Sequence, residues 1–423
     1  MRLMVIGGGG REHAIIKKLK ENPQIEVIYA LPGNGGIAAD AICVTEIGAK
    51  DIEKQVEFAK ANAIDYCVVA PDDPLALGAV DALTAAGIPC FGPNANAAII
   101  ESSKAFSKDL MKKYGIPTAA YEIFTDLQAA YDYLDKSPIP VVVKADGLAL
   151  GKGVIIAMTR EEAKEAVVSM MQDKKFGKSG DQVVIEEFLT GPEVSVLAFT
   201  DGKTVKPMVS SMDHKRIGEG DTGLNTGGMG TIAPNPCYTA ALADECMKTI
   251  FVPTIEAMNA EGRPFTGCLY FGLMMTPNGP KVIEYNCRFG DPETQVVLPL
   301  LESDLLTVMQ ATTNGTLAET EVTFSPGAAA CVIMASGGYP EAYAKGKEIT
   351  IPDELSENVI VAGAKLEDGK LLTNGGRVLG VIGMADTLKG ALDKAYENVS
   401  NINFEGAYYR RDIGARALAA MEE

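Results

Sequence analysis

The sequence predicts an α/β protein whose N-terminal part is built on a parallel sheet. Residues 1–103 alternate short apolar runs with helical patterns, which favours parallel strands with helices on both faces. The whole chain has 44 glycines, which is typical of an α/β enzyme built around tight turns. At 423 residues the chain is too long for one core, so we expect roughly three domains. Strands are expected at 3–6, 26–30, 65–70 and 89–91, and helices at 11–20, 51–61 and 76–86.

Composition excludes several classes of partner. The net charge of −18 argues against nucleic acid or an anionic membrane as the main partner. No stretch approaches the roughly 18 apolar residues of a membrane span, and the apolar start is too short for a signal peptide. Eight scattered cysteines without a C-x-x-C pair fit reduced thiols. We therefore expect a cytoplasmic protein, and the two histidines exclude a histidine-rich metal site.

A glycine turn, residues 7–10, links the first strand to the first helix. Its exposed amides and the helix dipole suit an anion. It does not fit the dinucleotide pattern, because Glu12 or His13 stands where the third glycine is required. A single phosphate held with Arg11 is the favoured interpretation, and a structural tight turn is the alternative. The loops at 34–36 and 71–74 should lie at the same sheet edge, where ligands of open α/β sheets bind.

The segment 139–154 places lysines beside a glycine-rich loop. Lys144 interrupts an apolar run and needs an anionic partner, since a buried unpaired charge is costly. Lys152 follows in the loop, but Gly153 after it excludes a P-loop, which requires Ser or Thr there. The segment predicts a hairpin that covers phosphates.

Residues 281–294 read KVIEYNCRFGDPET and predict a strand that ends in a turn. Because strand side chains alternate, Glu284, Asn286 and, if the strand continues, Arg288 should share one face. A carboxylate and an amide oxygen suit Mg²⁺, which takes few protein ligands and leaves room for phosphate and water. Arg288 could hold an anionic group with its planar fork. A strand face that only meets water is the alternative.

Residues 213–230 combine a polar cluster, DHKR, with a long glycine-rich loop. A loop of this length is usually functional or disordered, and its glycines, Asn and Thr favour substrate binding over a linker.

Ten stretches of the chain together resemble the phosphoribosylamine–glycine ligases (glycinamide ribonucleotide synthetases), a family of the ATP-grasp superfamily. The resemblance covers essentially the whole chain in the family's order. The stretches are GGGGREHA (7–14), PGNGG (32–36), FGP (91–93), SKAFSKDLM (103–111), VKADGLALGKGV (143–154), VIEEFLTGPEVS (184–195), DHKRIGEGDTGLNTGGMG (213–230), IEYNCRFGDPET (283–294), TNGGRVLGV (373–381) and RDIGARA (411–417).

The resemblance implies a fold, a domain division and a reaction. An N-terminal preATP-grasp domain (1–103) with a parallel sheet would precede a two-lobed ATP-grasp module (104–325, small lobe about 118–190) and a small α+β C-terminal domain (326–423). The implied enzyme is a cytoplasmic monomer that ligates glycine to 5-phosphoribosylamine through glycyl phosphate. It would consume ATP with Mg²⁺ or Mn²⁺ and give glycinamide ribonucleotide, ADP and phosphate.

The resemblance also implies residue roles. Metal ligands would be Glu284 and Asn286, and catalytic residues Arg288, Asp213 and Lys215. ATP would contact Lys104, Lys144, Gly151, Lys152, Gly153, Glu186, Glu187, Leu189 and Glu193. The other substrates would contact Gly8, Gly9, Gly10, Arg11, Glu12, Asn34, Gly35, Gly36, Asp72, Asn225, Thr226, Gly227, Gly228, Asn374, Gly375 and Arg377. Asp72 stands where the family usually has Glu.

Two other functions remain open from the sequence. Another ATP-grasp ligase of nucleotide metabolism, one that carboxylates or formylates a ribonucleotide, would share Lys144, Lys152, Glu284 and Asn286. It would not need the DHKR cluster together with the glycine loop. A nucleotide-binding regulatory protein without catalysis is the second alternative, and the intact Glu284, Asn286 and Arg288 argue against it.

Overall fold

The N-terminal part is a five-stranded parallel sheet in the order β3-β2-β1-β4-β5, in a computed structural model that describes residues 1–148 and 153–422. Side chains of β1 alternate between two cores, with Leu3 and Val5 in one and Met4 and Ile6 in the other. Both faces are therefore buried, which explains why the strand is continuously apolar. The parallel pairing of all five strands confirms the predicted sheet. Its elements are β1 (Arg2–Gly7), β2 (Val27–Pro32), β3 (Ile42–Cys43), β4 (Tyr66–Val69), β5 (Cys90–Phe91), α1 (Gly10–Leu19), α2 (Ile52–Ala61), α3 (Asp72–Ala76), α4 (Ala79–Ala85) and α5 (Ala95–Ser102).

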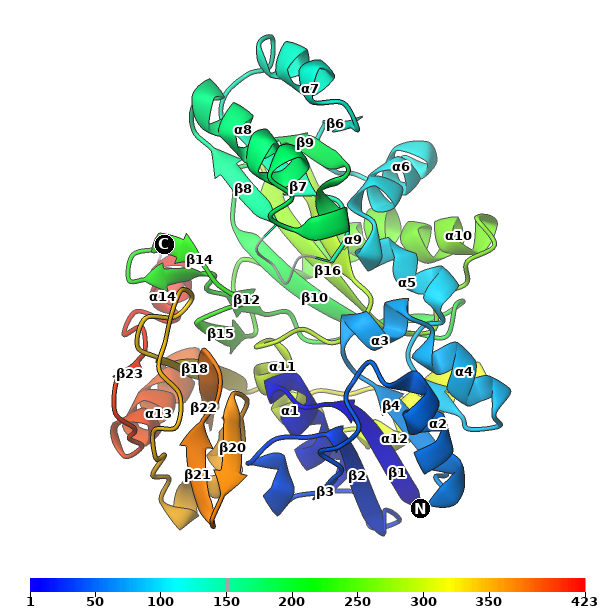
Figure 1. Ribbon diagram of the computed structural model, residues 1–423, viewed down its shortest axis with the longest axis vertical. Helices are drawn as coiled ribbons and strands as arrows, with labels where there is room; N and C mark the ends of the chain where they lie inside the picture. Colours follow the sequence, from blue (N-terminus) through cyan, green and yellow to red (C-terminus); the bar gives the residue numbers. More distant parts are fainter. Residues whose placement is uncertain (149–152, 423) are drawn as a thin grey trace.

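A separate small lobe follows α6 (Lys104–Tyr114) and projects at the top of Figure 1. Its antiparallel sheet has the order β6-β9-β7-β8, and its helices cover the sheet to form a core of their own. The lobe contains β6 (Tyr121–Phe124), α7 (Leu127–Leu134), β7 (Val141–Ala145), β8 (Val154–Ala157), α8 (Arg160–Val167) and β9 (Val183–Glu187).

The central sheet, β11-β10-β16-β17, carries the strand expected from residues 281–294. That strand is β17 (Gly279–Asn286), an antiparallel partner of β16 (Gly267–Thr276), so Glu284 and Asn286 lie at its carboxyl end. The remaining elements of this part are β10 (Glu193–Thr200), β11 (Val205–Pro207), α9 (Ala240–Cys246), α10 (Val252–Ala260), α11 (Thr294–Leu300) and α12 (Leu305–Asn314).

The C-terminal sheet includes strands from the middle of the chain. Its order is β12-β15-β18-β22-β19, with β23 pairing β18 as well. Its first two strands, β12 and β15, come from residues 212–233, and β15 pairs with β18. The sheet therefore crosses the domain boundary expected at 325/326, and that boundary stays a prediction. The elements are β12 (Met212–Asp213), β15 (Gly230–Ala233), β18 (Ala328–Ser336), β19 (Val359–Val361), β22 (Arg377–Ala385), β23 (Ala407–Tyr408), α13 (Leu388–Ser400), α14 (Ala415–Glu422) and the hairpins β13 (Arg216–Gly218)–β14 (Thr222–Asn225) and β20 (Ala364–Glu367)–β21 (Lys370–Thr373).

No helix in the described part of the chain combines the length and apolarity that a bilayer span requires.

Both histidines join the C-terminal part to the rest of the protein. His13 Nδ1 accepts the Val361 N–H at 2.8 Å, while Nε2 lies 2.9 Å from Asp40 Oδ2. His214 Nε2 accepts the Gly414 N–H at 3.1 Å, and its Nδ1 lies 3.0 Å from the Gly230 carbonyl oxygen. Burial lowers the pKa of His13 and lowers that of His214 to about 4. The folded protein therefore holds both imidazoles neutral.

We expect acid to weaken these junctions. The folded pKa of His214 is about 4, below the ordinary 6.5, so its contribution is complete above about pH 6.5 and is lost as the pH falls toward 4. The loss approaches about 1.4 kcal/mol per pH unit. Urea unfolding at pH 7.5, 6 and 5 measures it, with His214→Asn as the comparison because asparagine does not titrate. The wild type should lose more stability than the variant between pH 7.5 and 5, and equal losses would contradict this role of His214.

Candidate functional site

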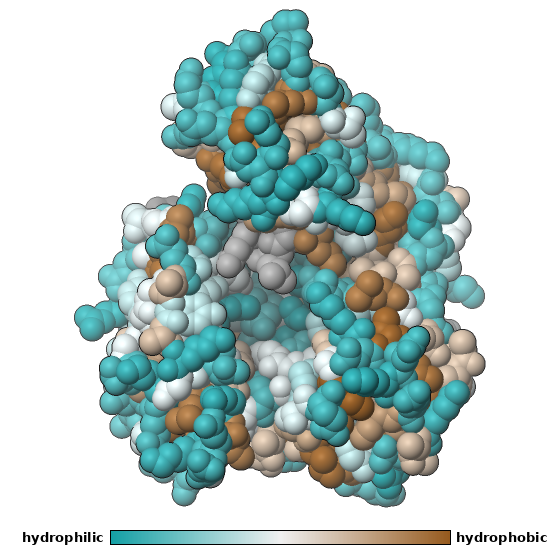
Figure 2. All heavy atoms as spheres, viewed as in Figure 1, coloured by the Kyte–Doolittle hydropathy of each residue, from teal (hydrophilic) through white to brown (hydrophobic). Residues whose placement is uncertain are grey.

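A cavity of about 700 Å³ lies where the small lobe, the central sheet, the N-terminal part and the C-terminal part meet. Figure 2 shows a hollow with hydrophilic residues below the projecting lobe. Many residues that the sequence singled out line this cavity. They are Arg11, Asp72, Lys104, Lys144, Gly153, Glu186, Glu187, Leu189, Glu193, Asp213, Lys215, Asn225, Thr226, Gly227, Glu284, Asn286, Arg288 and Arg377.

A second group of sequence-predicted residues lies outside the lining. It consists of Gly8, Gly9, Gly10, Glu12, Asn34, Gly35, Gly36, Gly228, Asn374 and Gly375. Gly151 and Lys152 fall outside the described residues.

Carboxylates of the protein occupy the helix N-terminus where the sequence predicts a phosphate. The Gly9 N–H donates to Glu12 Oε2 at 2.6 Å, and the Arg11 N–H donates to Asp291 Oδ2 at 3.2 Å. Both carboxylates satisfy amides that begin α1 and complement its dipole. The Arg11 side chain therefore lines the cavity, while the Gly9 and Arg11 amides hydrogen-bond carboxylates of the protein.

Asn34 joins the N-terminal sheet to the C-terminal part. Its Nδ2 donates to the Gly8 carbonyl oxygen at 3.0 Å and to that of Val361 at 2.8 Å. Its Oδ1 accepts the Gly36 N–H at 2.8 Å. Both ends of the Asn34 amide are thus engaged by backbone.

The oxygens expected to bind a metal lie together at the end of β17. Burial opposes ionisation of Glu284, but nearby ammonium groups, Lys215 first among them, outweigh it and lower the pKa of Glu284. Asn286 Nδ2 donates to Glu101 Oε1 at 2.9 Å, and in the part of the chain described here no protein group donates to Asn286 Oδ1. An ionised carboxylate and an unengaged amide oxygen fit a hard divalent cation that completes its shell with phosphate and water.

Glu101, which sequence reasoning missed, holds the end of β17 in place. Its Oε1 accepts from Asn286 and, at 2.8 Å, from Arg288 Nη2, while Oε2 accepts the Cys287 N–H at 2.7 Å. The carboxylate is 7% exposed. A lone Glu at the end of the apolar run in α5 was the available signal, because a buried charge needs partners.

A buried ion triad lies on the lysine-rich side of the cavity. Glu186 lies 3.0 Å from both Lys108 Nζ and Lys144 Nζ, and Lys144 also donates to the Ile283 carbonyl oxygen at 3.1 Å. Burial lowers the pKa of Lys108 to about 8 and also lowers that of Lys104. Lys108 was missed by the sequence analysis, although it follows Lys104 by one helical turn.

The other side of the cavity carries an acidic pair. Burial, with the negative charge of Glu293 next in importance, raises the pKa of Asp213 well above its usual range. Lys215 Nζ lies 3.6 Å from Glu193 and 3.9 Å from Glu284, and these carboxylates raise the pKa of the lysine. Asp213 and Glu293 together form an environment that favours an added cation.

The glycine loop is tied to the C-terminal part. Arg377 Nη1 donates to the Gly227 carbonyl oxygen at 2.8 Å and to that of Asp291 at 2.9 Å. Gly228 has φ +119°, and a Cβ there would lie 2.6 Å from Asp213 Oδ1. A side chain at Gly228 would be strained and would displace the carboxylate.

The triad predicts a large stability difference between adjacent glutamates. In Glu186→Gln the two buried ammonium groups lose their shared carboxylate, so we expect a loss of about 3–5 kcal/mol in unfolding free energy. The matched control is Glu187→Gln, because this exposed carboxylate lies 3.6 Å from Lys281 and such pairs contribute at most about 1 kcal/mol. Denaturant unfolding at pH 7.5 measures both, and similar losses for the two variants would contradict the triad.

Comparisons with known proteins bear on this arrangement. Three family models match in chain order: Phosphoribosylglycinamide synthetase, N domain (1–101), ATP-grasp (A) domain (102–294) and C domain (329–416). A phosphoribosylamine–glycine ligase of Pasteurella multocida is 48% identical over 99% of both chains. The trifunctional purine biosynthetic protein adenosine-3 of Gallus gallus is also 48% identical, over all of this chain and 43% of its own length.

Solved structures agree with the family models. The crystal structure of a Thermotoga maritima phosphoribosylamine–glycine ligase has a TM-score of 0.86 at 35% identity and covers 98% of this chain and 100% of its own. A Campylobacter jejuni biotin carboxylase has a TM-score of 0.74 at 14% identity, covers 100% of this chain and 95% of its own, and shows a shared fold. These matches confirm the predicted α/β fold with its ATP-grasp module. The chain belongs to the phosphoribosylglycinamide synthetase family, as the motifs in its sequence predicted.

Proposed function

We propose that this protein joins glycine to 5-phosphoribosylamine at the expense of ATP. The products are glycinamide ribonucleotide, ADP and phosphate, and the intermediate is glycyl phosphate. Relatives that carry the name of this ligase match the chain over its full length. The observation that carries the proposal is one cavity lined by Glu284 and Asn286 together with Lys104, Lys144, Asp213 and Glu293. Such a cavity can hold a nucleotide and an amino acid together.

The nucleotide is proposed to bind on the lysine-rich side. Lys104 and Lys144 line the cavity there and offer positive charge to phosphate oxygens, with Gly153 beside them. Glu187, Leu189 and Glu193 also line the cavity and are proposed to contact the adenosine. Glu186 would act indirectly, because both lysines of the triad already engage it.

Glu284 and Asn286 are the proposed holders of Mg²⁺ or Mn²⁺. When bound, such a cation neutralises charge on phosphate oxygens during phosphoryl transfer. The chain's own contribution is a fixed pair of oxygens, since Glu101 orients the Asn286 amide and the lysines keep Glu284 ionised.

Glycine is proposed to bind between the acidic pair and Arg288. Its ammonium group would offset the negative charge of Asp213, which burial and the neighbouring Glu293 otherwise disfavour. Its carboxylate would face Arg288, which Glu101 holds at the end of β17. Lys215 and the 225–227 loop line the same region.

5-Phosphoribosylamine is proposed to enter from the side of the N-terminal and C-terminal parts. Arg11, Asp72 and Arg377 line the cavity there, and the two guanidinium groups suit a phosphate. This side of the cavity would be supported by segments outside its lining: the glycine turn, the Asn34 loop and Asn374–Gly375.

The proposed chemistry needs positioning more than a protein nucleophile. A carboxylate is a poor electrophile, so its oxygen first takes the γ-phosphoryl group of ATP and ADP leaves. The amine then attacks the carbonyl carbon of glycyl phosphate and inorganic phosphate departs. Exclusion of water protects both the acyl phosphate and the labile amine. A monomeric cytoplasmic enzyme fits this proposal.

The direct test is the substrate dependence of ATP consumption by the purified protein. We expect ADP release to require glycine and 5-phosphoribosylamine together, with glycinamide ribonucleotide formed in equal amount. Glu284→Ala should lower turnover by ~10²-fold or more without loss of folding, because phosphate charge would lose its metal holder. Lys281→Gln, on the same strand and outside the cavity lining, is the matched control.

Turnover that depends on bicarbonate or formate in place of glycine would contradict the proposal and favour a carboxylating or formylating ligase. Near-normal turnover of Glu284→Ala would contradict the metal assignment.

A further inference from the structure

We infer that Arg410 is a positioning residue that fixes the β13–β14 hairpin against the cavity. The hairpin begins directly after Lys215 and ends at Asn225, so its placement sets where Lys215, Arg216 and the 225–227 loop lie. For its effect on the reaction this inference rests on the proposed function.

The hairpin cannot hold its own position. In the described sheets, β13 and β14 pair only with each other, and their register shifts between Arg216 and Gly218. Thr222, Gly223 and Leu224 are exposed, so the hairpin buries little apolar surface. An isolated two-stranded hairpin is marginally stable at best in water. Contacts from another part of the chain must therefore keep it in place.

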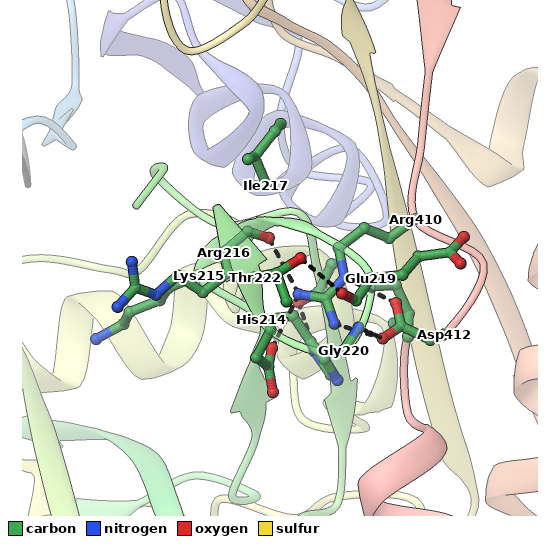
Figure 3. Close-up of polar contacts among 12 residues, drawn as sticks. His214, Lys215, Arg216, Ile217, Glu219, Gly220, Thr222, Arg410 and Asp412 are labelled. Carbon is green, nitrogen blue, oxygen red and sulfur yellow. Dashed lines mark hydrogen bonds and ion pairs between the residues drawn. The ribbon is translucent and has the colours of Figure 1, made fainter. Parts of the chain in front are cut away.

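The Arg410 guanidinium supplies the central contact. Its side chain is 1% exposed, and Nη1 donates at 3.0 Å to both the Arg216 carbonyl oxygen and Asp221 Oδ1. Nε and Nη2 donate to the two oxygens of Asp412 at 2.8 and 2.7 Å, a bidentate pair. Figure 3 shows the guanidinium between the hairpin and Asp412. One group thus bridges the first strand and the turn of the hairpin.

Neighbours of Arg410 reach the rest of the hairpin. Asp412 Oδ2 also accepts the Gly220 N–H at 2.8 Å, and the Tyr408 hydroxyl donates to the Ile217 carbonyl oxygen at 2.7 Å. The Arg411 N–H donates to Glu219 Oε1 at 3.1 Å. Together these contacts form a clamp, residues 408–412, that holds the hairpin through three backbone groups and the side chains of Glu219 and Asp221.

The clamp acts on the cavity from outside. Arg410 does not line the cavity, whereas Lys215, Arg216 and Asp221 do. Arg410 bonds the main chain of Arg216 and the side chain of Asp221, so it can set their positions without touching a substrate. Loss of the guanidinium would leave the Arg216 carbonyl oxygen and two carboxylates without these donors, and the hairpin would open more often.

Three variants of neighbouring arginines test the inference: Arg410→Met, Arg410→Lys and the matched control Arg411→Met. Arg411 is exposed and only its backbone N–H enters the clamp, which methionine retains. Hydrogen exchange of amides in 216–225 is the first readout. We expect exchange at least ~10-fold faster in Arg410→Met, an intermediate increase in Arg410→Lys, and no change in Arg411→Met.

Steady-state kinetics is the second readout. The KM for glycine should rise by ~10-fold or more in Arg410→Met, while the KM for ATP stays within ~2-fold, because the hairpin lies on the acidic side of the cavity. A merely structural role would instead lower the active fraction and leave both KM values unchanged.

Unchanged exchange in Arg410→Met, or an equal effect of Arg411→Met, would overturn the inference. If the wild type does not ligate glycine, the proposed function fails, yet the exchange comparison still decides the clamp. If Arg410→Met does not fold, Tyr408→Phe replaces it, since this exposed hydroxyl contributes one clamp bond. Exchange should then accelerate ~2–5-fold at the hairpin, and unchanged exchange would overturn the inference.

Discussion

The carboxylate of Glu101 is the interaction on which the centre of the site depends. It accepts hydrogen bonds from three consecutive residues, Asn286, Cys287 and Arg288, at the point where β17 ends. Strand geometry alone sets the face on which Asn286 lies, but it does not fix the Asn286 amide or the Arg288 guanidinium, which lies beyond the end of the strand. Glu101 comes from α5 in the N-terminal part, so the strand proposed to hold the metal is oriented by a distant part of the chain. The proposed site therefore exists only when both parts are packed together.

The same dependence across the chain recurs around the cavity. The C-terminal part holds the glycine loop through Arg377 and the β13–β14 hairpin through Arg410. On the lysine-rich side Glu186 is shared by Lys108 and Lys144, so positive charge remains there, while on the other side the buried Asp213 lies near the negative charge of Glu293. We propose that this difference suits phosphates in one place and a cationic substrate group in the other. A net charge of −18 is thus compatible with anionic substrates, because cations gather inside the cavity.

The sequence predicted what depends on local rules and missed what depends on distant partners. Alternation along a strand was enough to place Glu284 and Asn286 on one face, whereas Arg288 lies beyond the end of β17. Nothing local could show that Glu101, 185 residues from Asn286, would bind both Asn286 and Arg288. The glycine turn illustrates the converse: its spacing suits an anion, and in the structure the Gly9 amide bonds Glu12 while the Arg11 amide bonds Asp291, 280 residues along the chain. Patterns identify groups that need partners, and only the fold decides whether the partner is protein or ligand.

The turnover of a Glu101→Gln variant most directly tests whether this carboxylate assembles the site. Glu101→Gln keeps the size of the side chain but replaces one acceptor oxygen with a donor and removes the charge that Arg288 pairs with. We predict that glycine- and 5-phosphoribosylamine-dependent ATP turnover falls by ~10–100-fold, as expected for loss of a charge-assisted network, while the circular dichroism of the fold is retained. Wild-type turnover in Glu101→Gln would contradict the claim that this carboxylate assembles the site.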